Sequence, residues 1–247
     1  MNQKPLILTL LVATLLLAAP QVVQAQELSL SLADNGSISA RSIQLILLLT
    51  VLSLAPGLAI MITCFPFLVT VLSIVRQGIG MQQAPPNMLI ISLAMFLTYF
   101  VMEPVFNDAW VNGISPLVEE QLGVEAAVTR ALEPFRAFMA ARLDPDTFFA
   151  MSELRPGTQG IAPTPDAPLS VLIPSFLLSE ISRAFQIGFL VFLPFLIIDL
   201  VVAAILMSMG MMMVPPAVVS LPFKLAFFVV ADGWSLIASA LVRSYYP

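Results

Sequence analysis

The chain has 247 residues, of which 59% are hydrophobic and 10% are charged, with a formal net charge of −5 and a mean hydropathy of +0.98. Because an ordinary soluble domain carries about 25% charged residues, this composition nearly excludes a water-soluble enzyme. The chain has no histidine, the commonest general base and the usual zinc ligand. Its single cysteine, Cys64, allows no intrachain disulfide and lies in an apolar stretch, where a thiol packs as a small hydrophobe. We therefore expect no catalysis, no metal and no other cofactor.

The first 25 residues have the pattern of a secretory signal peptide. Lys4 precedes an apolar run over residues 6–19, which is shorter than the ~20 residues that span a bilayer. Val23-Gln24-Ala25 then places a cleavage site after Ala25. We predict that the mature chain starts at Gln26 and that its polar N-terminus, residues 26–42, lies outside the cytoplasm. The alternative interpretation is an uncleaved anchor helix.

The next segment, residues 43–110, is predicted to form a first hydrophobic helical hairpin. Residues 43–75 carry no charge, and as one helix they would be about 50 Å long, against an apolar bilayer thickness of about 30 Å. Pro56-Gly57 and Pro66 are expected to break or kink this helix. The following apolar run, residues 88–102, is short for an independent span and stops at Glu103-Pro104.

The middle of the chain holds its net charge. Residues 103–170 contain ten acidic and four basic side chains, a balance of −6 that equals that of the mature chain. This stretch is also rich in proline, so we predict an acidic, water-facing helical segment over residues 111–170. Basic residues in the short loops are too few to orient the chain by charge. We predict membrane crossings near residues 43–64, 85–110, 184–207 and 217–242. Because two crossings precede the acidic segment, it lies on the same side as the outside N-terminus, in the periplasm.

A second hydrophobic hairpin is predicted over residues 171–247, and it contains charges that apolar surroundings disfavour by roughly 2.5–3.5 kcal/mol each. These are Glu180, Arg183, Asp199, Lys224 and Asp232. Glu180 and Arg183 would share one helix face. Lys224 has no such neighbour and needs Glu180, Asp199 or Asp232 across helices or subunits. Pairing for assembly is one interpretation of these charges, and a conducting or proton-relay role is the other. The apolar run within this hairpin, residues 184–198, is again short for a span.

A methionine cluster lies between the two halves of this hairpin, beside Gly210 and before Pro215-Pro216. Five of seven positions are methionine: Met207, Met209, Met211, Met212 and Met213. A cluster next to glycine and proline favours a loop over a helix stripe. Methionine is apolar and flexible, so the loop could either close a pore or pack against neighbouring helices. Composition leaves these two possibilities open.

Three stretches of the chain resemble signatures of the FliP family. Residues 174–189 read PSFLLSEISRAFQIGF, residues 222–234 read PFKLAFFVVADGW, and the loop at residues 76–87 contains RQGIG and QQAPPN. The resemblance extends from about Ile43 to Trp234, although the acidic segment matches only loosely. The signal peptide also fits the family pattern.

The resemblance implies an all-α, membrane-associated subunit of the flagellar type III protein export gate in the bacterial inner membrane, at the flagellar basal body and partly on its periplasmic side. It implies a homo-oligomer, reported as a pentamer, with FliQ and FliR, next to FlhB and FlhA. Unfolded flagellar proteins would pass through this assembly, which contacts lipid and binds no nucleic acid. Met209, Met211, Met212 and Met213 would then form the pore gasket. A virulence-type secretion homologue and a secondary transporter or ion channel are the alternatives.

Overall fold

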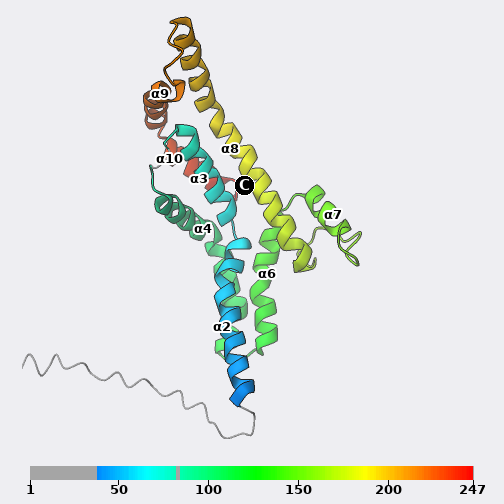
Figure 1. Cartoon of the computed structure of the whole chain (residues 1–247). Coiled ribbons are helices and arrows are strands. Elements are labelled where there is room, and N and C mark those ends of the chain that lie inside the picture. The colour runs from blue at the N-terminus through cyan, green and yellow to red at the C-terminus, as the bar shows by residue number, and fades with distance from the viewer. Residues whose placement is uncertain (1–37, 82–83, 247) are drawn as a thin grey trace, which may run out of the picture. The chain divides into compact units, whose positions relative to one another are not determined.

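The computed structural model describes residues 38–81 and 84–246 (Figure 1). All regular structure in these residues is helical, as predicted. Two helical stretches are long and apolar enough to cross a membrane, and a bent helix pair raises the number to three. The predicted signal peptide, its cleavage site at Ala25 and Gln26, and residues 26–37 lie outside the described residues. Chain contacts divide the molecule into two units, Met1–Val51 and Leu52–Pro247.

The first described helix, α2, comprises Ile38–Met61 and continues through Pro56-Gly57. Of the break or kink predicted at that dipeptide, the break does not occur. Apolar helices tolerate an internal proline when small local adjustments satisfy the carbonyl that it leaves free. The chain turns at residues 62–64 instead, where the Thr63 hydroxyl donates to the Ile60 carbonyl at 2.9 Å. The next helix, α3 (Phe65–Ile79), has Pro66 in its first turn, where the missing N–H has no helical partner to lose.

The second apolar run forms a longer helical stretch than the sequence predicted. Helix α4 (Asn87–Ala109) passes through Pro104, continues as a π-helical turn (Trp110–Ile114) and ends in α5 (Ser115–Val118). The acidic segment then forms α6 (Val124–Arg142) and α7 (Pro145–Glu153). Glu103-Pro104 does not end the helix, which agrees with the predicted crossing near residues 85–110 although the apolar run itself is shorter.

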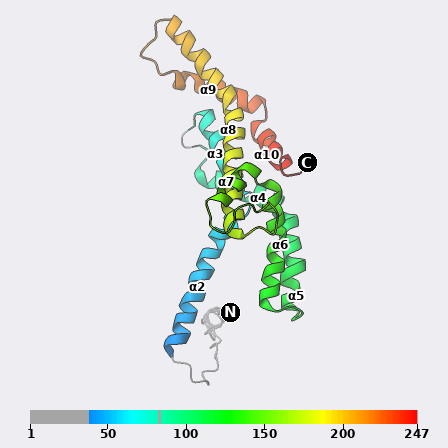
Figure 2. The same ribbon diagram turned by 90° about the vertical axis from the view of Figure 1, so that its right-hand side faces the viewer.

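The longest element is α8 (Leu169–Ser208), which is continuous over 40 residues, or about 60 Å, despite Pro174, Pro194 and Asp199. Helix α9 (Pro216–Val230) returns beside its end, and α10 (Gly233–Arg243) follows after a bend of 60°. Figure 2 shows this hairpin of α8 and α9, with the methionine loop at its tip. The helix continues through Asp199, as the predicted crossing near residues 184–207 requires, and it extends well beyond the apolar run of residues 184–198.

Helix α3 lies at the centre of the larger hydrophobic core, packed mainly against α8 and also against α4 and α9. Its inner face, which includes Phe67, Leu68, Val71 and Leu72, is fully buried. Gly188 of α8 allows close contact with α3, because a Cβ there would lie 2.4 Å from the Ile74 Cδ1 atom. A smaller core joins α6 and α7 to the start of α8.

Much apolar surface stays outside these two cores. Only 17% of the most apolar stretch of α8 and 22% of that of α4 and its extension is buried within the chain. Large side chains are exposed on both, such as Phe96, Phe185 and Phe189. Exposed apolar surface of this extent requires lipid or neighbouring protein to cover it.

Candidate functional site

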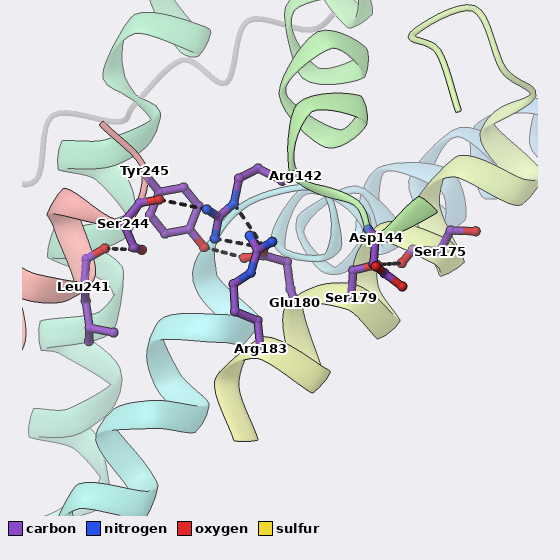
Figure 3. Close-up of polar contacts among 9 residues, drawn as sticks. All are labelled: Arg142, Asp144, Ser175, Ser179, Glu180, Arg183, Leu241, Ser244 and Tyr245. Atoms are coloured by element: carbon purple, nitrogen blue, oxygen red, sulfur yellow. Dashed lines mark hydrogen bonds and ion pairs between the residues drawn. The ribbon is translucent and has the colours of Figure 1, made fainter. Parts of the chain in front are cut away.

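The Glu180 carboxylate is the centre of a buried polar cluster (Figure 3). Arg142, at the end of α6, forms an ion pair with it at 3.1 Å and donates from Nε at 3.2 Å. The Tyr245 hydroxyl donates to the second carboxylate oxygen. Arg183, one turn further along α8, lies 3.8 Å away. The acidic segment, α8 and the C-terminal tail therefore meet at one satisfied carboxylate.

Arg142 also holds the C-terminal tail directly. Its Nη1 atom donates to the Ser244 carbonyl at 2.8 Å, and its guanidinium lies 4.0 Å from the centre of the Tyr245 ring. An arginine over an aromatic face is stabilised by a cation–π interaction of about 0.5–2 kcal/mol. Residue spacing does not indicate Arg142 and Tyr245 as partners, because they approach Glu180 from 38 and 65 residues away.

Tyr246 compensates for a proline in α4. In a helix the Phe100 carbonyl would accept from the N–H of residue 104, but Pro104 has no N–H. The Tyr246 hydroxyl lies 3.3 Å from the Phe100 carbonyl oxygen and 3.0 Å from that of Val101. The tail thus supplies a donor to the Phe100 carbonyl, which the proline leaves free, and also reaches the neighbouring Val101 carbonyl.

A second ion pair joins α8 to α9. Lys224 Nζ lies 2.6 Å from Asp199 Oδ2, and the Ser220 hydroxyl lies 2.5 Å from Oδ1. The lysine side chain is 6% exposed and the aspartate 32%. Of the three carboxylates that the sequence left open as partners for Lys224, the structure selects Asp199, while Glu180 is engaged elsewhere.

The two ion-pair clusters are separated along one helix. Glu180 and Asp199 lie 19 residues apart on α8, which corresponds to about 28 Å. This is close to the apolar thickness of a bilayer, about 30 Å. Arg183 is the one charged residue between them. The apolar stretch between the clusters thus has roughly the length of one membrane crossing.

Asp232 differs from the other charges in this region. It lies at the bend between α9 and α10, its residue is exposed, and no described residue donates to its carboxylate or pairs with it. The predicted pairing of Asp232 for assembly therefore finds no partner among the described residues of this chain.

The methionine loop follows from the end of α8. Gly210, with φ of +71°, ends the helix: its N–H donates to the Met207 carbonyl and the Met211 N–H donates to the Leu206 carbonyl, both at 3.0 Å. This is the Schellman pattern of helix termination, which favours glycine at that position. The side chains beyond it are increasingly exposed: Met211 42%, Met212 86% and Met213 97%. Met209 is 67% exposed, and Met207 belongs to the last turn of α8.

The acidic segment is tied to α8 through the start of α7. The backbone N–H of Asp144 donates to the Ser179 hydroxyl at 2.9 Å. The Asp144 carboxylate accepts from the Thr147 hydroxyl and N–H, at 2.7 and 2.9 Å, and these bonds hold its pKa below the usual value. Asp144 is therefore an N-cap that is stronger when ionised.

A helical chain with two long apolar helices and ion pairs buried between its helices defines an α-helical membrane protein. Residues 48–241 match the model of the FliP family, so the chain belongs to that family. It is 47% identical to the flagellar biosynthetic protein FliP of Agrobacterium fabrum (strain C58 / ATCC 33970), over 96% of this chain and 98% of that protein. It is 44% identical to the protein of the same name from Bacillus subtilis (strain 168), over 87% of this chain and 96% of that protein.

Proposed function

We propose that this chain is a core subunit of the flagellar type III protein export gate. Several copies, five on the family resemblance, assemble with FliQ and FliR around a channel for unfolded flagellar proteins, next to FlhB and FlhA. Membership of the FliP family supports this proposal, and so does the name that its relatives carry, flagellar biosynthetic protein.

The observation that carries the proposal is the mismatch between α8 and a simple membrane crossing. The helix is about 60 Å long, twice the apolar thickness of a bilayer, yet 17% of its most apolar stretch is buried within the chain. Lipid would cover about half of such a helix, so the rest requires neighbouring protein. Asp199, a third exposed, and Asp232 also favour protein or water over lipid as neighbours.

The methionine loop suits a gate. Met211, Met212 and Met213 lie at the tip of the hairpin of α8 and α9, and they have few contacts within the chain. Methionine excludes water because it is apolar, and it yields to a passing polypeptide because it is unbranched and flexible. Several copies around one axis would place many such side chains in a single constriction, with Met209 next to it.

The contacts of the C-terminal tail support a proposal for the location of the subunit. The bond between Arg142 and the Ser244 carbonyl brings the end of α6 and the C-terminus together. Helix α8 leads away from this meeting point, and α9 and α10 return to it. The acidic segment and the C-terminus therefore face the same side of the membrane. With a cleaved signal peptide that side is the periplasm, and the methionine loop lies towards the opposite end of α8.

The experiment is co-expression of the full chain with FliQ and FliR, followed by purification on a tag carried by this chain. We expect one large complex that contains all three proteins, and loss of flagellar protein secretion when the gene is deleted. A chain that purifies without them, in a strain whose secretion does not need it, would contradict the proposal and favour the transporter alternative. The relatives compared above carry a flagellar name, which favours the flagellar over the virulence-type alternative.

A further inference from the structure

The bend between α9 and α10 is a fixed structural feature. Asp232 adopts a left-handed backbone, φ +47° and ψ +49°, which is uncommon for residues other than glycine. Gly233 follows, and a Cβ there would lie 2.3 Å from the Phe228 ring. The Phe228 ring in turn contacts Trp234 edge to face, with centroids 5.2 Å apart. These contacts hold the backbone conformation of the bend.

The Asp232 carboxylate lacks the partners that the other acids of this region have. Glu180 is neutralised by Arg142, and Asp199 by Lys224. Among the described residues none donates to the Asp232 side chain, although the flanking Val230 is 88% exposed and apolar. An unpaired charge on an apolar surface is costly and, where it persists, indicates a function.

Beside Asp232 lies a pocket of about 560 Å³ with almost entirely apolar walls. Its lining includes Met81, Pro85, Leu225 and Trp234. Of the described residues that line it, Asp232 alone is charged. The long apolar stem of a lysine or arginine fits such walls, while its charged end reaches an acid at the rim.

The basic residues of the adjoining helices do not supply a cation that pairs with Asp232. Lys224 of α9 pairs with Asp199, and Arg76 of α3 donates to Asn87 and to the Pro85 carbonyl. Arg243 ends α10, eleven residues from Asp232, or about 16 Å along the helix. Among the described residues of these elements, no basic side chain is available to the pocket, which favours a cation from another polypeptide.

We propose that Asp232 and this pocket are a docking site for a lysine or arginine side chain that projects from an apolar helix of a neighbouring subunit. The inference rests on the proposed function, because that function supplies the neighbouring subunit. The apolar stem lies in the pocket and the cation pairs with Asp232. Pairing removes the cost of an isolated carboxylate and fixes the register of the neighbour against the bend.

The test compares Asp232→Asn, Asp232→Gly and Asp232→Lys in the full chain, with the exposed loop carboxylate Asp166→Asn as the control. Asparagine tolerates a left-handed backbone, and glycine favours it. The purified chain should therefore melt at the wild-type temperature with Asp232→Asn and at or above it with Asp232→Gly. Both variants should lower the yield of assembled complex at least fivefold, and Asp232→Lys should lower it further.

Selection of motile revertants from Asp232→Lys identifies the partner. We expect a change of lysine or arginine to an acidic residue in an apolar helix of a neighbouring subunit. Wild-type complex yield from all three variants, or revertants confined to the pocket walls of the same chain, would overturn the inference. If the wild-type chain itself fails to assemble, the proposed function fails. If it assembles and Asp232→Asn assembles equally well, only the docking site is wrong.

Discussion

Removing either member of the ion pair between Lys224 and Asp199 should destabilise the chain, but by unequal amounts. Asp199→Ala leaves an ammonium that is 94% enclosed without a counter-ion, and loss of one member of a buried pair costs about 3–5 kcal/mol. Lys224→Met leaves a carboxylate that is a third exposed and still accepts from Ser220 at 2.5 Å. Water and this hydroxyl compensate in part, so we expect the smaller loss, about 1–3 kcal/mol.

The double variant Asp199→Ala with Lys224→Met separates pairing from packing. It removes both charges, so it should be less destabilised than Asp199→Ala alone, with a coupling of about 1–3 kcal/mol in the double-mutant cycle. The assay is thermal unfolding of the purified chain in detergent, followed by size-exclusion chromatography. Additive losses of stability in the double variant, or equal losses from the two single variants, would refute the claim that this ion pair stabilises the folded chain.

Three further predictions concern the C-terminal tail and the acidic segment. Tyr246→Phe should lower stability by about 0.5–1.5 kcal/mol in thermal melts, because it removes the donor to the α4 carbonyls, while Tyr99→Phe should change nothing. Glu180→Ala should cost about 3–5 kcal/mol and release the tail to proteolysis, because it leaves an arginine unpaired, and an unchanged cleavage pattern would contradict the cluster. The bonds from Thr147 lower the pKa of Asp144 from 3.8, so its stabilising effect should be complete above that pH and be lost as the pH falls through the lowered pKa. Asp144→Asn should abolish this acid dependence in melts from pH 2 to 7.

The features that the sequence predicted correctly depend on local chemistry. The apolar composition indicated membrane helices, and the described residues contain two or three stretches able to cross. The loop after α8 was predicted from Gly210 and the prolines that follow, and the Schellman bonds give the physical reason. Pro66 also lies where a helix begins.

Proline and charge end the apolar runs of the sequence, but they do not end the helices. Pro56, Pro104 and Asp199 all lie inside helices. At two of these positions the cost is offset by contacts that sequence spacing does not reveal. Tyr246 donates to the Phe100 carbonyl, which Pro104 leaves without its helical donor, and Lys224 neutralises Asp199.

The clusters themselves were only partly predictable. The charges of the second hairpin stand out in an apolar sequence, so Glu180 and Lys224 were found. Arg142 and Tyr245 were not, because one belongs to a charge-rich segment and the other to a short tail. Their role depends on contacts across 38 and 65 residues, which residue spacing on one helix cannot indicate.

The central claim is that this subunit forms a gated channel, and resting ion leakage through assembled complexes tests it most directly. Cells should express wild-type protein, the triple variant of Met211, Met212 and Met213 to alanine, or the control Met88→Ala, at matched complex levels. Met88 is 72% exposed on α4, away from the loop. We predict higher ion permeability from the triple variant alone, with secretion only partly reduced. Unchanged permeability with an intact complex would contradict the assignment of the loop to the pore.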